Sequence, residues 1–327
     1  MNKTPVKDIA EALSMSPSTV SRALNGKGRI SEKTKKKIFD YLKENDPESI
    51  YLQKTKTNHT VGVIIEFLSI EFFALLIEML QSQFATKDID VVLGITQGSQ
   101  ELTNKYVRQY VKNQYDAIIA ISLFRSTIDK DELGDIPLIA FDIDPIKEGK
   151  CDLLFQSDRY YGAVISTEEL IQAGCKKIAY FTNTYLDEVK FKGFKDCLAS
   201  HHMDFDENLY IASGSFSKNS IEDAKMMTEY LLGKQYEFDG IVATSDRRAL
   251  GAIIALQMYG KTFDDIKVVG YDYSTLAQSF KITSISQDIE AITTNIFLAV
   301  MSYIDPDAYQ QPIKKLFPVS LIRGQTT

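Results

Sequence analysis

From residue 61 onward the sequence alternates between short apolar runs and segments with the spacing of amphipathic helices. The run at 61–67 is apolar except for one glycine and one glutamate, and apolar residues then recur every three or four positions from Phe73 to Phe84. Strands that are apolar along their whole length and alternate with helices form parallel sheets covered on both faces. Two such series, at 61–143 and 152–271, predict two doubly wound parallel-sheet subdomains.

The N-terminal segment follows a different pattern, centred on the stretch 16–25. Ser16 is a favourable N-cap, and Pro17 suits the first helical position because its missing N–H costs nothing there. One face of this helix is apolar, whereas the other carries small polar groups and one arginine. The residues of the polar face are Ser18, Ser21, Arg22 and Asn25. Such a face fits the major groove of DNA, where arginine pairs with guanine and hydroxyls reach base edges or phosphates.

Another helix is predicted before this one. Thr4 can cap it, and apolar residues recur at helical spacing between residues 6 and 13. Because only two residues separate the two helices, they form a helix-turn-helix, which a third helix capped by Ser31 follows. The alternative is a helical hairpin that only packs. The polar outward face and the basic cluster at 33–37 argue against it.

Charge is distributed unevenly along the chain. Residues 1–59 hold 12 Lys and Arg against 7 Asp and Glu, a net charge of +5, although the whole chain is at −7. The remaining residues therefore carry −12. A basic head on an acidic body confines attraction to DNA to one end of the chain.

Other function classes find no support in the composition. No apolar run approaches the roughly 20 residues of a membrane span, and the N-terminus holds the helix-turn-helix rather than an export signal, so we expect a cytoplasmic protein. The 3 cysteines lack Cys-x-x-Cys spacing and are typical of reduced thiols. The 3 histidines show no metal-ligand spacing, and no phosphate loop or nucleophile elbow is present. We therefore expect no enzyme, no cofactor and no metal.

Three runs in the N-terminal segment carry a family resemblance. The sequences at 7–10, 16–25 and 30–34 resemble the headpiece of the lactose-repressor (LacI/GalR) family of transcription regulators. The resemblance implies that three positions read bases and that four contact phosphates. The base readers are Pro17, Ser18 and Arg22, and the phosphate contacts are Ser16, Thr19, Ser21 and Asn25. Because two short recognition helices need two-fold symmetry to read two half-sites, we expect a homodimer on a palindromic operator.

Two places near this headpiece depart from the family pattern. Ser14 stands where the family usually has glycine in the turn, so mild strain is expected there. The joint at 46–60 is polar and lacks helical periodicity. The resemblance implies a hinge helix in this joint, with Leu52 as an apolar wedge in the minor groove. The alternative is a flexible linker with Leu52 packed on the body.

The resemblance extends over the body and implies the fold of periplasmic sugar-binding proteins. In that fold the chain crosses three times between two subdomains, here near 156–158, 285–288 and 307–314. We therefore expect a helix-turn-helix headpiece at 1–45 and a hinge or linker at 46–60. The first effector subdomain comprises 61–156 with 288–308, and the second comprises 157–287 with 309–327.

Ligands of open parallel sheets bind at the carboxyl ends of the strands, so two facing sheets form a cleft between those ends. Carboxylates, amides and aromatic faces suit a sugar, because the polar groups bind its hydroxyls and a ring covers its apolar face. Residues of these kinds follow the predicted strands or match the family's positions. The expected effector-binding residues are Phe72, Phe73, Ser122, Asp142, Lys190, Ser245, Asp246, Asp272 and Gln287.

Some of these residues have structural alternatives. Asp246 directly precedes a predicted helix and can cap it, and Phe72 and Phe73 can belong to the core. Lys190 stands where the family usually has arginine and cannot make the two-pronged arginine grip. Ser245 stands where the family frequently has Asn or Asp. These departures leave the identity of the effector open.

The sequence as a whole predicts a dimeric DNA-binding repressor of carbohydrate-utilisation genes. A small sugar or sugar phosphate between the two subdomains is expected to control it. Two alternatives stay open. One is a regulator of the same fold that uses a protein corepressor, and the other is a sugar-binding receptor without DNA function, against which the headpiece argues.

Overall fold

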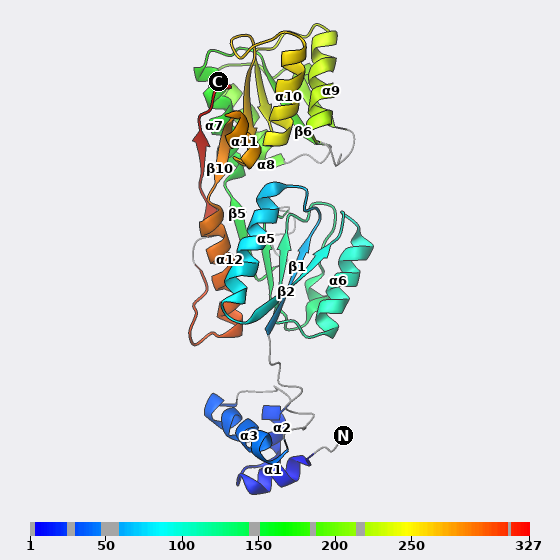
Figure 1. Ribbon diagram of the computed structural model, residues 1–327, viewed down its shortest axis with the longest axis vertical. Helices are drawn as coiled ribbons and strands as arrows, with labels where there is room; N and C mark the ends of the chain where they lie inside the picture. Colours follow the sequence, from blue (N-terminus) through cyan, green and yellow to red (C-terminus); the bar gives the residue numbers. More distant parts are fainter. Residues whose placement is uncertain are drawn as a thin grey trace. The chain divides into compact units, whose positions relative to one another are not determined.

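The computed structural model describes residues 4–24, 30–46, 59–143, 151–183, 188–213, 220–312 and 315–327 (Figure 1). The chain divides into an N-terminal unit, Met1–His59, and a body, Thr60–Thr327. Within the described ranges, no helix has the length and apolar character needed to span a membrane.

The N-terminal unit contains three described helices, α1 (Val6–Ala12), α2 (Pro17–Leu24) and α3 (Glu32–Asn45). They enclose a small core made of Ile9, Ala10, Val20, Ala23, Leu24, Ile38 and Leu42. The predicted caps of α2 and α3 are confirmed. Ser16 Oγ accepts a hydrogen bond from the Thr19 N–H at 3.1 Å, and Ser31 Oγ accepts one from the Thr34 N–H at 3.2 Å. Ser14 has φ +53°, the left-handed conformation expected for the turn.

The predicted cap of α1 is wrong. The residue before this helix is Pro5, which makes no side-chain capping bond. The hydroxyl of Thr4 instead donates to the carboxylate of Asp46, the residue after α3. Thr4 therefore ties the start of the helix-turn-helix to the end of the third helix.

The first lobe of the body is built on a six-stranded sheet in the order β11-β5-β4-β3-β1-β2. Its strands are β1 (His59–Ile65), β2 (Ile89–Ile95), β3 (Ala117–Ile121), β4 (Leu138–Phe141), β5 (Leu153–Ser157) and β11 (Leu316–Phe317). The recorded pairings of β1, β3, β4, β5 and β11 are parallel. Its helices are α5 (Glu71–Ala85), α6 (Gln100–Lys112) and α12 (Ile289–Ile304), with a 3-10 turn η1 (Lys130–Leu133).

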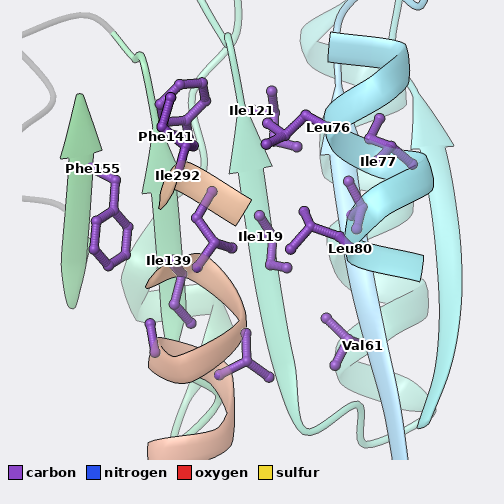
Figure 2. Packing of buried hydrophobic residues seen from close by; sticks show 14 of the residues in the cluster. Val61, Leu76, Ile77, Leu80, Ile119, Ile121, Ile139, Phe141, Phe155 and Ile292 are labelled. Carbon is purple, nitrogen blue, oxygen red and sulfur yellow. The ribbon is translucent and has the colours of Figure 1, made fainter. Parts of the chain in front are cut away.

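Apolar side chains fill both faces of this sheet, as the unbroken apolar runs predict. On one face, Leu76 and Leu80 of α5 and Ile292 of α12 pack over Ile119 and Ile139 of the sheet (Figure 2). On the other face, α6 contributes a second cluster. Burying large aliphatic side chains stabilises the fold by roughly 1.5–3 kcal/mol each, so these two layers fix the strand order and hence the positions of the strand ends.

The second lobe repeats this architecture with the strand order β12-β10-β9-β8-β6-β7. Its strands are β6 (Ile178–Asn183), β7 (Tyr210–Ser213), β8 (Gly240–Ala243), β9 (Lys267–Tyr271), β10 (Thr283–Gln287) and β12 (Val319–Ile322). All these strands pair in parallel except β10 with β12, which is antiparallel. Its helices are α7 (Arg159–Gln172), α8 (Glu188–Ser200), α9 (Ser220–Gly233), α10 (Asp246–Met258) and α11 (Thr275–Phe280), with a 3-10 turn η3 (Glu207–Leu209). Two doubly wound lobes therefore confirm the predicted fold class.

The chain crosses between the lobes after β5, after β10, and between β11 and β12. The first two crossings lie where the sequence predicts them. The third was expected at 307–314 but lies later, because Leu316 and Phe317 still pair with β5 in the first sheet. Residues 316–322 form two strands in two sheets, separated by Pro318, whose missing N–H cannot continue a ladder. Leu316 and Phe317 thus belong to the first lobe rather than to the second.

Candidate functional site

The exposed face of α2 carries the residues predicted to contact DNA. Val20, Ala23 and Leu24 are buried against the other two helices, which turns the opposite face to solvent. On that face Ser16, Pro17, Ser18 and Arg22 are exposed, and Thr19 and Ser21 are half-buried. An exposed guanidinium among small hydroxyls is suited to hydrogen bonds with base edges and phosphates in a major groove.

Hydroxyl groups are held together at the start of α2. Ser16 Oγ lies 2.9 Å from Ser18 Oγ and 2.8 Å from Thr19 Oγ1, in addition to accepting the Thr19 N–H. The N-terminus of a helix attracts phosphate, so these hydroxyls are suited to contact a DNA backbone, and that contact stays a prediction. Asn25 and Leu52 fall outside the described residues, and their roles stay predictions.

The body contains a cavity of about 300 Å³ between the carboxyl ends of the two sheets. All nine predicted effector-binding residues line it, namely Phe72, Phe73, Ser122, Asp142, Lys190, Ser245, Asp246, Asp272 and Gln287. The fold therefore brings together side chains that the sequence distributes over both lobes. The volume of the cavity lies at the lower end of the roughly 300–1,000 Å³ typical of small-molecule sites.

Phe72 and Phe73 form an aromatic part of the wall in the first lobe. They are 6% and 9% exposed, and their ring centroids lie 6.2 and 6.4 Å from that of Phe141 in the core. Both rings are thus anchored by core packing while also lining the cavity. Phe72 and Phe73 therefore belong to the core and also line the cavity, and their contact with an effector stays a prediction.

Asp142 is positioned by the first crossing segment. The residue has φ +47°, and its Oδ1 accepts a hydrogen bond from the Ser157 N–H at 2.9 Å. Arg159, at the start of α7 in the second lobe, places its Nε 3.9 Å from the same oxygen, and both side chains are only 6% exposed. Asp142 therefore lines the cavity and also contacts a residue of the second lobe.

The opposite wall is organised around Asp272, directly after β9. Its Oδ1 accepts a hydrogen bond from Gln287 Nε2 at 3.0 Å, and Gln287 Oε1 accepts one from the Ser157 hydroxyl at 2.5 Å. A chain of hydrogen bonds thus runs from one crossing segment through another to Asp272. Burial raises the pKa of the Asp272 carboxyl, while Lys190 and the Gln287 hydrogen bond act in the opposite direction.

Lys190 lies beside this carboxyl on α8. Its Nζ is 3.4 Å from the centroid of the Tyr271 ring, which is a close cation–π contact. The arginine usual in the family could hold a ligand with two parallel hydrogen bonds from its planar guanidinium, which the ammonium group of a lysine cannot do. Lys190 supplies a point charge that can take a single hydroxyl or anionic oxygen.

Asp246 is fully engaged by the protein itself. It is 1% exposed; its Oδ2 accepts hydrogen bonds from the N–H and hydroxyl of Ser274 at 2.7 and 2.8 Å, and its Oδ1 accepts one from the Ser284 hydroxyl. The alternative in which Asp246 caps its helix is wrong, because Ser245 is the N-cap of α10. Burial, and then the charge of Asp272, raise the pKa of Asp246 to about 7.

Arginine side chains that the sequence did not single out also line the cavity: Arg125, Arg159, Arg247 and Arg248. Arg248 is 8% exposed, and burial lowers its pKa to about 10. Its guanidinium donates to Ser245 Oγ at 3.3 Å, while its Nε has no hydrogen-bond partner among the described residues. The position of Arg248 in the cavity could have been predicted from its spacing, because a helical side chain one turn after the N-cap points back toward the strand end.

Two family profiles match separate parts of the chain. Residues 5–46 match the bacterial regulatory proteins of the lacI family, and residues 167–327 match the periplasmic binding protein-like domain. The lacI match covers the helix-turn-helix. The periplasmic binding protein-like match covers most of the second lobe and the C-terminal segment that returns through the first lobe.

Two relatives that are similar over their whole length are named as repressors. The ribose operon repressor of Halalkalibacterium halodurans is 28% identical, with 99% of this chain and 97% of that protein covered. The sucrose operon repressor of Pediococcus pentosaceus is 26% identical, with 99% of each covered. The crystal structure of the lac repressor dimer bound to operator and an anti-inducer has a TM-score of 0.71 at 20% identity, covering 100% of this chain and 99% of that one. This last likeness shows a shared fold.

Proposed function

We propose that this chain, which belongs to the LacI family of bacterial regulatory proteins, is a cytoplasmic repressor of carbohydrate-utilisation genes controlled by a small sugar or sugar phosphate. The observation that carries the proposal is the cavity of about 300 Å³ lined by both lobes. A ligand there can contact both lobes at once, which is the condition for it to favour one arrangement of the lobes over another.

The chemistry of the wall suits a polyhydroxylated ligand. Asp142 and Asp272 supply acceptors from opposite lobes, Lys190 supplies a donor, and Phe72 and Phe73 supply an apolar surface. Hydrogen bonds to charged groups contribute about 1.5–3 kcal/mol each, so loss of one acceptor matters to a small ligand. The arginines around the cavity would in addition stabilise an anionic group such as a phosphate.

Operator binding is assigned to the exposed face of α2. In this proposal Arg22 reads a base edge and the hydroxyls at the start of the helix contact phosphates. One such helix covers only a half-site, so two copies on a palindromic operator supply the affinity and specificity.

Exposed apolar side chains on the second lobe support a homodimer. Met226 and Tyr230 on α9 are 60% and 48% exposed, and Met258 and Tyr259 at the end of α10 are 63% and 51% exposed. Helices α9 and α10 lie side by side (Figure 1). Large exposed apolar residues on adjacent helices are typical of interfaces. Light scattering on the Met226→Lys, Tyr230→Lys double variant should show a monomer where the wild type shows a dimer. A wild-type monomer would remove this part of the proposal.

Ligand-induced stabilisation tests the sugar assignment. A ligand that binds only the folded state stabilises that state and so raises the melting temperature. At a hundred times its Kd, the ligand adds about 2.7 kcal/mol to the free energy of unfolding. Melting curves of the full chain would be recorded with pentoses, hexoses, disaccharides and their phosphates. The proposal expects one chemical class to raise Tm and to change operator affinity. A protein stabilised by none of them, yet binding its operator, would instead favour the protein-corepressor alternative.

A further inference from the structure

Glu168, Cys197 and His201 bring three different donor groups together on the second lobe, away from the cavity. One donor atom from each, a carboxylate oxygen, a thiol sulfur and a ring nitrogen, lies within 4.8 Å of the other two. His201 Nε2 is 2.6 Å from Glu168 Oε2, and Cys197 Sγ is 3.7 Å from the same oxygen. These residues take no part in the operator or effector sites described above.

The packing of α7 on α8 explains this arrangement. Cys197 and His201 are four residues apart, which puts them on one face where α8 ends. Gly193, one turn earlier on the same face, lets the helices approach closely: a Cβ there would lie 2.4 Å from the carbonyl oxygen of Tyr160 on α7. The close approach brings Glu168 of α7 opposite the thiol and the imidazole.

We propose that Glu168, Cys197 and His201 form a binding site for a divalent transition metal of the Zn²⁺ class, with water as the fourth ligand. Thiolate, imidazole and carboxylate are the ligands that Zn²⁺ takes in proteins. Ligand atoms around a tetrahedral Zn²⁺ lie roughly 3.3–3.7 Å from one another, as its bond lengths require. The separations here, between 2.6 and 4.8 Å, bracket that range, so small side-chain rotations suffice.

Access and support for the site are both present. The side chains of His201 and Glu168 are 37% and 31% exposed, which leaves room for an ion and a water molecule to enter. Glu168 Oε1 accepts a hydrogen bond from Gln172 Nε2 at 2.8 Å, one turn further along α7. Outer hydrogen bonds of this kind orient metal ligands, and their loss typically costs about 10–100-fold in affinity.

Metal binding at this site must release a proton. Cysteine binds Zn²⁺ as the thiolate, whereas an ordinary free thiol is mostly protonated at neutral pH. A bound divalent cation takes the thiolate, and the thiol proton passes to the buffer. Affinity should therefore rise with pH.

The site is separate from the effector cavity but shares its helices. Arg159 at the start of α7 and Lys190 near the start of α8 line the cavity. Glu168 and Cys197 lie nine and seven residues further along, roughly 14 and 10 Å at the rise of a helix. A metal that fixes α7 to α8 would therefore steady one wall of the cavity without touching its contents.

Titration of the chelator-treated full chain with Co²⁺ and Zn²⁺ tests the proposal. Cys197→Ser and His201→Gln are the test variants. Cys175→Ser, at another buried thiol of the same lobe, and His202→Gln, at the neighbouring imidazole, are matched controls. We expect one equivalent of Co²⁺ to give a thiolate charge-transfer absorption that Zn²⁺ displaces, and calorimetry in two buffers to show release of about one proton.

The test variants should lose the charge-transfer absorption or weaken Zn²⁺ binding by more than about 100-fold. A loss of that size exceeds the effect of an outer-shell partner. The control variants should keep both the absorption and the affinity of the wild type. Melting curves without metal show whether each variant is folded, and Gln172→Ala offers a milder change with an expected loss of about 10–100-fold. Binding without the thiolate absorption, or unchanged in Cys197→Ser, would overturn the proposal.

Discussion

Glu71 Oε1, at the start of α5 in the first lobe, accepts a hydrogen bond from the backbone N–H of Thr275, at the start of α11 in the second lobe, at 3.0 Å. The two residues are far apart in the sequence and meet beside the cavity. The crossing segments already join the lobes through Ser157 and Gln287. The Glu71 bond adds a connection that does not pass through a crossing, and it can form only when the lobes are close.

Removing this bond should weaken effector binding. We expect Glu71→Ala to favour separated lobes by about 1 kcal/mol, the net value of a hydrogen bond, and hence to raise the effector Kd roughly fivefold. Glu71→Gln keeps an acceptor oxygen and should stay near the wild type. Calorimetric titration with the sugar found by the melting screen gives the Kd values. Equal affinities for wild type and Glu71→Ala would show that the bond does not contribute to closure.

Arg22 should contribute specificity, whereas Lys36 should contribute general attraction to DNA. Loss of a two-pronged base contact costs about 1–3 kcal/mol, so Arg22→Ala should weaken operator binding by that amount for each half-site and leave random DNA little affected. Lys36 is exposed on α3, and Lys36→Ala should weaken both DNAs alike and reduce the slope of log K against log salt by about 0.9 for each bound subunit. Fluorescence anisotropy with both DNAs checks this. A uniform loss in Arg22→Ala would contradict its role as a base reader.

Asp246 should make the body less stable as pH rises. Its pKa is about 7 in the folded protein against the ordinary 3.8, so between these values the folded state holds a proton that the unfolded state has lost. Stability therefore falls from about pH 4 to pH 7 and then levels off. At about 1.4 kcal/mol per pKa unit, the wild type should lose on the order of 2–3 kcal/mol from this group between pH 5 and pH 8.

The variant Asp246→Asn isolates that contribution. Asn cannot ionise but keeps an acceptor for Ser274, so the difference in unfolding free energy between pH 5 and pH 8 should shrink by on the order of 2–3 kcal/mol. Urea unfolding at both pH values measures it. A variant with the same pH dependence as the wild type would show that Asp246 is ionised throughout.

The sequence predicts the fold class and the cavity well because one physical rule governs both. Apolar strands that alternate with helices form parallel sheets, and the ends of those strands meet at one edge. Asp142 and Asp272 could be located from this rule alone. Whether they contact an effector stays a prediction that the experiments here address.

The parts that the sequence did not reveal depend on contacts between distant segments. The donors of Ser274 and Ser284 that occupy Asp246 come from later elements. Leu316 and Phe317 pair with the first sheet, although their composition suits either one. Likewise, no spacing along the chain links Glu168 to Cys197, because two adjacent helices bring them together.

Asp272 is the residue on which effector control should depend most. It accepts from Gln287 at a crossing segment and lies beside Lys190, so a ligand bound to it is coupled to the arrangement of the lobes. Its φ of +99° is poorly tolerated by alanine, so Asp272→Asn accompanies Asp272→Ala as a variant that keeps the backbone preference and removes the charge. Asp264→Ala, at an exposed acidic residue of the same lobe, is the control.

Operator binding measured with and without the effector, on the wild type and these variants, tests the account most directly. We expect the effector to shift wild-type and Asp264→Ala operator affinity by at least about fivefold, as allosteric coupling typically does. Asp272→Ala and Asp272→Asn should bind operator within a few-fold of the wild type yet give no shift at the same effector concentration. A shift of wild-type size in both Asp272 variants would contradict control through this cavity.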